Sequence, residues 1–179
     1  LGFRDLGPGD FVVHRDHGSH GGWIHPSYRV ADVERLTNAT LPVVLSINCS
    51  TGWFDTETCQ AQYPPARRGD SFAETLLALP GSGAVAVVAS TRISFTGPNN
   101  VFSEELSRAL TIPGIELGEA LLHAKTRLAD RRGDGAHTRA TQEMFHLFGD
   151  PAAPFEAGLA AGPSFTPVAL ATPDLLRGR

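Results

Sequence analysis

PVVLSINCSTGWF, at residues 42–54, is the stretch that decides the fold predicted for this chain. Its apolar run from Val43 to Ile47 is short, β-branched and preceded by proline, which is typical of a fully buried parallel strand. The run ends in a polar turn that contains Cys49. Functional side chains of open α/β sheets lie just beyond the carboxyl ends of parallel strands, so Cys49 is a candidate reactive residue. A second interpretation stays open, because free cysteines are also among the most buried side chains of protein cores.

A second strand and turn of the same kind lie upstream. The apolar sequence at residues 11–14 leads into a turn rich in glycine and histidine at residues 15–22. Apolar residues at helical spacing predict a crossover helix over residues 27–36. Such a crossover places the exit loops of neighbouring parallel strands side by side. We therefore expect His17 and Cys49 to face each other across one cleft.

The composition is that of one globular domain with its own core. The chain has 179 residues, of which 41% are hydrophobic and 19% are charged. Its formal net charge of −4 gives no basic patch for a nucleic-acid partner. No apolar run has the length of a membrane span. The sequence opens on Leu1 without a signal peptide, and its only methionine is Met144, so we expect a processed product or a fragment of a longer precursor.

The remaining patterns predict an alternation of strands and helices. The predicted elements after the Cys49 strand are helices at 71–79 (capped by Asp70), 102–110, 116–131 and 138–148 and a buried strand at 84–89. This order predicts an α/β fold with a mainly parallel sheet. Residues 155–179 are rich in proline, glycine and alanine without periodicity, which indicates a tail or linker with at most an edge strand near 165–170. Two cysteines do not make a disulfide framework, and a bridge between Cys49 and Cys59 stays open as an alternative, although it would disable Cys49 as a nucleophile. Cys59 is interpreted as a structural thiol rather than a second nucleophile.

The pairing of a cysteine with a histidine has a defined chemistry. A thiol attacks a carbonyl carbon as the thiolate, and a neighbouring imidazole favours that form and later carries the proton to the leaving amine. Gly18, directly after His17, leaves room for a substrate carbonyl. The backbone N–H groups of Gly18 and Cys49 are candidates for an oxyanion hole, whose loss typically costs about 3–4 kcal/mol of transition-state stabilisation.

These motifs resemble those of the gingipain-type cysteine peptidases, which form a clan with the caspases, legumains and separases. The residues that carry the resemblance are, in chain order, His17-Gly18-Ser19, Cys49 with Gly52 and Phe54, Phe72-Ala73-Glu74, the strand 84–89 with Ser90-Thr91, and FHLFGDP at 145–151. The resemblance implies a caspase-haemoglobinase-like three-layer sandwich. It also implies that residues 1–154 are the C-terminal, catalytic part of a gingipain-like peptidase domain, whose N-terminal strands come from sequence upstream of this chain.

The resemblance further implies roles for single residues. It assigns the nucleophile to Cys49 and the general acid/base to His17. Phe95 stands where the family places an aromatic wall of the substrate-binding site, and Trp53 and Ser90 are expected to contact substrate beside it. The acidic groups that orient the histidine, or that read a basic P1 side chain in relatives, come from upstream sequence. A preference for arginine or lysine at P1 is therefore not implied.

Partners and location follow from the same resemblance. The expected partners are a peptide or protein substrate and the upstream segment of the same precursor, with no nucleic acid and no membrane span. No cofactor is required, although Asp55 is a candidate contact for a structural Ca²⁺ ion. The resemblance favours a bacterial protein that is secreted or held at the cell surface.

Two alternative functions stay open. The turn from His14 to His25, together with Asp16, is dense enough in possible ligands for a metal-dependent hydrolase or a metal-binding module. The second alternative is a non-catalytic, caspase-like binding or scaffold domain. The metal site predicts activity that a chelator abolishes and thiol alkylation leaves intact. The scaffold predicts that a peptidyl electrophile does not label Cys49.

Overall fold

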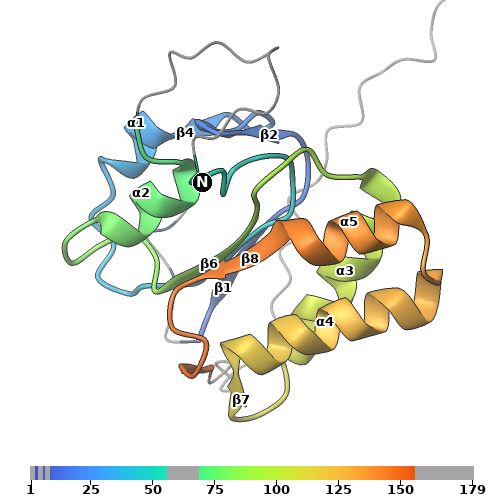
Figure 1. The fold of residues 1–179 in the computed structure, drawn as a ribbon. Coiled ribbons are helices and arrows are strands. Elements are labelled where there is room, and N and C mark those ends of the chain that lie inside the picture. The colour runs from blue at the N-terminus through green and yellow to red at the C-terminus, as the bar shows by residue number, and fades with distance from the viewer. Residues whose placement is uncertain (1–2, 4–5, 7–8, 56–68, 156–179) are drawn as a thin grey trace, which may run out of the picture.

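The centre of the fold, seen in a computed structural model, is a four-stranded sheet (Figure 1). The structure describes residues 3, 6, 9–55 and 69–155. The strands of this sheet are β1 (Phe11–His14), β5 (Val43–Ser46), β6 (Ala86–Ser90) and β8 (Phe145–Phe148), in the spatial order β1-β5-β6-β8. The first three are parallel to one another and β8 is antiparallel to β6. The register pairs His14 with Ser46, so β1 and β5 end side by side.

The two central strands are buried along their whole length. Every residue of β5 and of β6 is buried, which matches their uninterrupted apolar or small-residue sequences. Successive side chains point to opposite faces of the sheet, so each strand supplies two cores. Leu45 and Val88 belong to the core on one face, and Val44 and Val87 to the core on the other. The predicted α/β fold with a mainly parallel sheet is confirmed.

Helices cover both faces of the sheet (Figure 1). The helices are α1 (Val30–Val33) and α2 (Phe72–Ala78) on one face, and α3 (Thr96–Ala109), α4 (Leu117–Arg132) and α5 (Ala136–Met144) on the other. The core under α3 includes Phe102 and Phe145, whose ring centroids lie 4.7 Å apart. Full burial of a side chain of this size contributes about 1.5–3 kcal/mol. Three layers result, as expected.

The helix predicted at residues 71–79 begins one residue later than predicted, as α2. Its N-cap is Ser71, whose hydroxyl accepts the backbone N–H of Glu74 while the Glu74 carboxylate accepts the N–H of Ser71. This reciprocal arrangement satisfies two backbone donors at once. The prediction that Asp70 is the cap was wrong, because the signal that decides the position is a serine followed three residues later by glutamate.

Two further helices differ from their predicted extents. The helix predicted to begin at Phe102 begins at Thr96, and the polar segment before Phe102 forms its first turns. Pro98 fits there, since the first turn of a helix needs no N–H from proline. In contrast, α1 is shorter than the predicted helix over residues 27–36, because Tyr28 and Arg29 form a strand instead. The helix predicted at 116–131 is confirmed as α4.

The last predicted helix was wrong over its final four residues. Residues 138–148 were expected to be helical, but α5 ends at Met144 and Phe145–Phe148 form β8. Pairing with β6 places Phe145 in the core and leaves His146 exposed. Tertiary pairing at the edge of the sheet thus overrides the local helical pattern.

Two small sheets were not predicted. The first contains β2 (Gly18–Ser19), β3 (Gly22–Trp23) and β4 (Tyr28–Arg29), and the second pairs β7 (Ile115–Glu116) with β9 (Pro154–Phe155). Strands of two residues are too short to leave a periodic pattern in the sequence. The first of these sheets is important for the site, because it shapes the turn that carries the predicted histidines.

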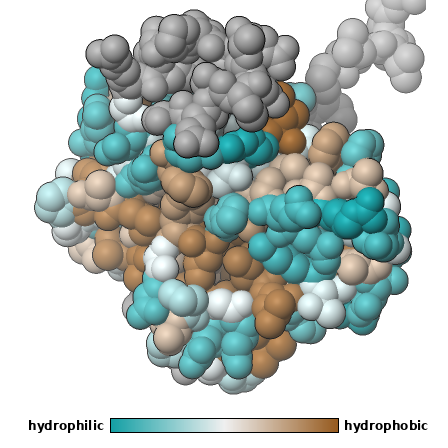
Figure 2. Space-filling model, in the orientation of Figure 1, coloured by the Kyte–Doolittle hydropathy of each residue, from teal (hydrophilic) through white to brown (hydrophobic). Residues whose placement is uncertain are grey.

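Figure 2 shows hydrophobic residues grouped over β8, whereas the outer face of α5 is hydrophilic. Phe54, near β8, is about half exposed and its ring contacts that of Phe148.

Among the described residues, no helix is both long and apolar enough for a bilayer crossing. The predicted edge strand near 165–170 and the proposed structural thiol Cys59 lie outside the described residues.

Candidate active site

The loop that carries Cys49 leaves the sheet at the carboxyl end of β5. Cys49 is a free, partly buried thiol, and Ser50 directly after it has a φ of 57°, in the left-handed region that non-glycine residues seldom adopt. Two hydrogen bonds to the exit of β6 hold this turn: the Ser50 N–H donates to the Arg92 carbonyl and the Gly52 N–H to the Ser90 carbonyl, each at 3.0 Å. The thiol is therefore presented by a sharp turn that two hydrogen bonds tie to the exit of β6.

The predicted histidine turn lies at the carboxyl end of the neighbouring strand, β1. His17 immediately precedes β2 and its side chain is exposed. Its backbone N–H donates to the Asp16 carboxylate, and its carbonyl accepts the N–H of Ile24 at 3.0 Å. The His17 ring meets that of His25 edge to face, with centroids 6.4 Å apart. The backbone of the turn is thus ordered while the imidazole remains accessible.

The two loops pack directly against each other. A Cβ added to Gly18 would lie 2.6 Å from Cγ of Asn48 and 3.0 Å from the carbonyl oxygen of Cys49. Real Cβ atoms do not come this close to such neighbours, so only glycine fits between His17 and the Cys49 loop. The glycine that the sequence placed after His17 is therefore needed for close approach of the two turns.

The beginning of α2 binds both loops. The N–H of Phe72 donates to the His20 carbonyl at 2.9 Å, and the N–H of Ala73 donates to the Thr51 carbonyl at 3.0 Å. The first N–H groups of a helix have no partner within the helix and are free for such contacts. Two successive amides of one helix thus tie the histidine turn to the cysteine turn.

A buried polar network lies beneath the two turns. The Asn48 side-chain amide donates to Nδ1 of His14 at 2.8 Å and to Oγ of Ser46 at 3.0 Å, and its oxygen accepts the Thr51 hydroxyl at 2.8 Å. Nε1 of Trp23 donates to the Ser46 hydroxyl at 2.8 Å. All five side chains are buried. Buried polar groups that are mutually satisfied in this way favour one geometry over its alternatives.

His14 serves in this network as a neutral ring. Nδ1 accepts from Asn48, and Nε2 donates to the His25 carbonyl at 3.0 Å, an arrangement that assigns the proton to Nε2. Burial lowers the pKa of His14, which favours the same neutral form. Its ring stacks on Trp23 with a centroid distance of 4.4 Å.

The alternative metal site from His14 to His25 finds no support in this geometry. Both nitrogens of His14 are already in hydrogen bonds, so metal ligation would break one of them. Across the part of the chain that the structure describes, no three histidine, cysteine or acidic side chains are grouped as metal ligands would be.

The sulfur of Cys49 contacts a residue that the sequence did not single out. The backbone N–H of Ser94 donates to Sγ at 3.4 Å, and the carbonyl and hydroxyl oxygens of Ser94 each lie 3.8 Å from the sulfur. The Ser94 hydroxyl in turn donates to the Asn48 carbonyl at 2.9 Å and accepts from Asn99 at 2.6 Å. The available signal was the place of Ser94 in the exit loop after the third parallel strand, next to that of Cys49.

The three predicted substrate-contacting residues have different surroundings. Phe95 is partly buried and stacks on His137, with ring centroids 4.0 Å apart. Trp53 is 7% exposed, with the Arg92 guanidinium 5.9 Å from its ring centroid. Ser90 is completely buried and its hydroxyl donates to the Arg92 carbonyl at 2.6 Å, so this side chain faces the interior.

Asp55, the predicted Ca²⁺ contact, is paired with Arg92. The guanidinium donates to both carboxylate oxygens, and this hydrogen bonding, aided by the positive charge, lowers the pKa of Asp55. The carboxylate charge is thereby balanced within the chain. A structural Ca²⁺ ion stays a prediction.

Comparison with known protein families identifies the family of this chain. The model of peptidase family C25 matches residues 9–156, which is most of the chain. The chain belongs to peptidase family C25. The predicted resemblance to gingipain-type cysteine peptidases is confirmed, and so, at the level of the family, is the prediction of a cysteine-type peptidase. No curated protein matches the sequence.

Solved structures agree with this membership in peptidase family C25. The Arg specific cysteine proteinase gingipain R (RgpB) superposes with a TM-score of 0.69 at 20% identity, over 82% of this chain and 33% of that chain. A complex of the Porphyromonas gingivalis RgpB pro- and mature domains gives a TM-score of 0.70 at 19% identity, over 82% and 34%. At such identities the likeness shows the fold. The C25 chain spans about a third of the length of the gingipain chains that it matches.

Proposed function

We propose that the chain is the catalytic part of a cysteine endopeptidase that hydrolyses peptide bonds through Cys49 and His17. The observation that carries this proposal is the packing of the His17-Gly18 turn directly onto Asn48 and Cys49. A nucleophile and a base must share one site to act together, and the packing supports such sharing for these two residues. Membership in peptidase family C25 supports the reaction class.

In the proposed reaction the Cys49 thiolate attacks the carbonyl carbon of the scissile peptide bond, forming a C–S bond. The His17 imidazolium donates its proton to the leaving nitrogen, and the C–N bond breaks to leave a thioester. Water then attacks the thioester carbon after giving a proton to His17. The C–S bond then breaks, which releases the acid product and leaves the Cys49 thiolate with the His17 imidazolium for the next cycle.

Several groups are proposed to stabilise charge in this sequence. The N–H groups of Gly18 and Cys49 stabilise the oxyanion of the tetrahedral intermediate. The Ser94 N–H, 3.4 Å from Sγ, stabilises negative charge on the sulfur before attack. All of these donors belong to the backbone, so their directions are fixed by the turns rather than by side-chain rotamers.

The proposal includes an upstream segment of the same precursor as a partner. The family relative whose pro- and mature domains form a complex supports this partner, as does the length of the gingipain chains, of which the chain spans about a third. Secretion or display at a bacterial cell surface is also proposed, on the resemblance alone. The reaction itself draws on residues of this chain and requires no cofactor.

The test replaces the nucleophile and compares it with the other cysteine of the chain. In the full-length protein, Cys49→Ala is expected to lower peptide hydrolysis at least about 1,000-fold, because no other group forms the thioester. The matched control Cys59→Ala is expected to retain parental activity. A peptidyl acyloxymethyl ketone is expected to label Cys49, as located by mass spectrometry.

Two results would contradict the proposal. Normal hydrolysis by Cys49→Ala would show that Cys49 is not the nucleophile. Activity that a chelator abolishes and thiol alkylation leaves intact would favour the metal-dependent alternative. For the base, His17→Ala is expected to lower hydrolysis strongly, while His123→Ala, an exposed histidine on α4, is not.

A further inference from the structure

A positively charged side chain lies within electrostatic reach of the proposed nucleophile and has no assigned role. Arg15 follows the last residue of β1 and stands two positions before His17. Its side chain is partly buried and reaches the start of α3. The guanidinium donates through Nε to Oδ1 of Asn100 at 3.1 Å and through Nη2 to the Thr96 carbonyl at 2.9 Å.

Arg15 and the thiol of Cys49 contact the same short segment, residues 94–100. The sulfur of Cys49 contacts Ser94, and Arg15 contacts Thr96 and Asn100 of α3, the helix that begins two residues after Ser94. The electrostatic environment of Arg15 agrees: burial lowers its pKa, whereas the charges of Asp16 and of a Cys49 thiolate act in the opposite direction. The guanidinium is thus within electrostatic reach of the reacting sulfur.

The guanidinium retains donors for a ligand. Its two hydrogen bonds use Nε and Nη2, and Nη1 has no partner among the described residues. A guanidinium binds carboxylates best through two parallel N–H donors, and the edge formed by Nη1 and Nη2 has this geometry. Both observed acceptors are neutral oxygens, so they orient the fork without neutralising it.

The charge of Arg15 is also not balanced by an ion pair within the described residues. Arg92, the other guanidinium near the Cys49 turn, differs in this respect because Asp55 accepts from two of its nitrogens. The neighbouring Asp16 acts on Arg15 through charge, while its carboxylate accepts the N–H of His17. Of the two arginines near the thiol, only Arg15 therefore has both charge and donors available.

We propose that Arg15 is the specificity-determining residue of this peptidase and that its guanidinium binds the carboxylate of an aspartate or glutamate at P1. This inference rests on the proposed function. The P1 side chain is attached next to the carbonyl that Cys49 attacks, so it is the side chain of a substrate that a cation within electrostatic reach of the thiol is placed to bind. The substrate class is accordingly peptides cleaved after acidic residues.

The experiment measures kcat/KM of the mature full-length enzyme on peptides that differ only at P1. The P1 residues are aspartate, glutamate, asparagine, leucine, lysine and arginine. Aspartate is expected to exceed asparagine by about 10- to 100-fold, the range of a hydrogen-bonded charge pair. Arg15→Gln is expected to abolish this ratio, and Arg15→Glu is expected to favour lysine and arginine.

Two control variants separate recognition from folding. Arg15→Lys keeps the charge without the planar fork and is expected to retain a reduced preference for acidic P1 residues. Arg139→Gln removes an exposed arginine on α5 and is expected to leave the ratio unchanged. Three results would each overturn the role of Arg15. Arg15→Gln could keep the aspartate-to-asparagine ratio of the parent, the parent enzyme could prefer neutral or basic P1 residues, or Arg15→Gln could lose kcat equally on all peptides.

The failure of this inference is distinguishable from that of the proposed function. Cleavage, or covalent labelling of Cys49 by peptidyl acyloxymethyl ketones, with a non-acidic preference overturns only the role of Arg15. The absence of both cleavage and labelling across the whole P1 series overturns the peptidase proposal, and the role of Arg15 with it.

Discussion

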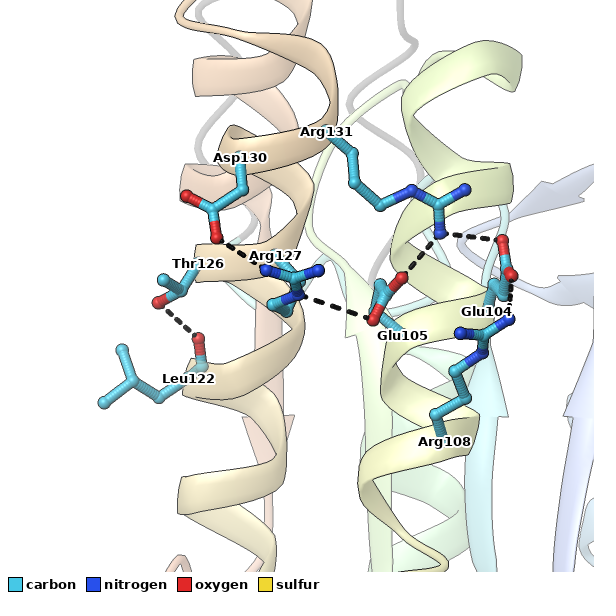
Figure 3. A network of polar contacts seen from close by, with 8 residues as sticks. All are labelled: Glu104, Glu105, Arg108, Leu122, Thr126, Arg127, Asp130 and Arg131. Atoms are coloured by element: carbon cyan, nitrogen blue, oxygen red, sulfur yellow. Dashed lines mark hydrogen bonds and ion pairs between the residues drawn. The ribbon is translucent and has the colours of Figure 1, made fainter.

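Two polar networks in this chain differ in charge, in burial and in what they hold together. The network beneath the site joins neutral, buried side chains: His14, Trp23, Ser46, Asn48 and Thr51. The network between α3 and α4 joins charged side chains that are mostly at the surface: Glu104, Glu105, Arg108, Arg127, Asp130 and Arg131 (Figure 3).

The ionic network has one buried member. Figure 3 shows Arg131 reaching from α4 to both glutamates of α3. Its Nη1 lies 2.9 Å from Glu104 and 2.5 Å from Glu105, whose side chains are 41% and 6% exposed. Hydrogen bonding from Arg131 lowers the pKa of Glu104. Exposed pairs of this kind contribute little to stability, since water screens them and ordering their side chains costs entropy.

The difference indicates that the two networks have different structural roles. Neutral, buried hydrogen bonds fix the relative position of two loops, because any displacement leaves a polar group unsatisfied away from water. Surface ion pairs tolerate displacement, because water replaces a lost partner. We therefore expect the first network to set the geometry of the site and the second to adjust the packing of two helices.

The largest expected effect is on Asn48. Asn48→Ala removes the partner of His14 Nδ1 and of the Thr51 hydroxyl, so we expect the free energy of unfolding to fall by about 3 kcal/mol. Urea denaturation measures this change. In folded protein, the rate at which a peptidyl electrophile labels Cys49 is also expected to fall, because the Cys49 turn loses its anchor.

Asn38 provides a matched control for this effect. It is another buried asparagine, and its side chain bonds the Thr40 and Gly83 carbonyls and the Gly83 N–H. Asn38→Ala is expected to lose similar stability but to keep the parental labelling rate in folded protein. Equal labelling in both variants would show that the network stabilises the fold without positioning the thiol.

An intermediate effect is expected at the buried end of the ionic network. Glu105→Ala leaves Arg131 without its buried partner, and we expect unfolding free energy to fall by about 2 kcal/mol. Glu104→Ala, its exposed neighbour, is expected to cause no measurable change in urea denaturation. The rate of Cys49 labelling is expected to equal that of the parent in both variants. A slower rate in Glu105→Ala would show that the ionic network also affects the geometry of the site.

The smallest expected effect is a pH dependence that belongs to His14. Burial lowers its pKa in the folded state below the unfolded value of about 6.5, so the unfolded chain binds this proton more tightly. Its contribution to stability is therefore complete above the unfolded pKa and is lost as the pH falls below that value toward the folded pKa.

Denaturation between pH 7.5 and pH 5, as a rough window around the unfolded value, tests this dependence. His14→Gln is expected to give a flatter profile than the parent, because one titrating group is removed. His123→Gln, at an exposed position of α4, is expected to keep the parental slope. A parental slope in His14→Gln would mean that its titration does not contribute to stability.

Local patterns in the sequence predicted the elements with strong, continuous signals. The apolar runs of β1, β5 and β6 and the amphipathic stripe of α4 were all identified. Elements defined by partners distant in sequence were missed. Phe145–Phe148 were interpreted as helix, because their local pattern continues that of the preceding helix. They form a strand only through their pairing with β6.

The candidate site followed the same rule. Cys49, His17 and Gly18 were singled out from the sequence, since each lies shortly beyond a strong strand signal, and their catalytic roles stay predictions. Ser94, Arg15 and the role of Asn48 were not singled out, because their partners are far away in the chain. The guanidinium of Arg15, for example, bonds Thr96 and Asn100, which lie 81 and 85 positions further along the chain. Spacing in the sequence carries no information about such contacts.

The sequence by itself determined the parallel sheet and the strand ends at which a thiol and an imidazole emerge, because burial periodicity and glycine-containing turns are local properties. Only the tertiary structure decided what surrounds them: the packing of Gly18 against the Cys49 turn, the two amides of α2 that tie both loops, and the bond from the guanidinium of Arg15 to the start of α3. Such features depend on how folded segments pack in space, and packing joins residues without regard to their separation along the chain.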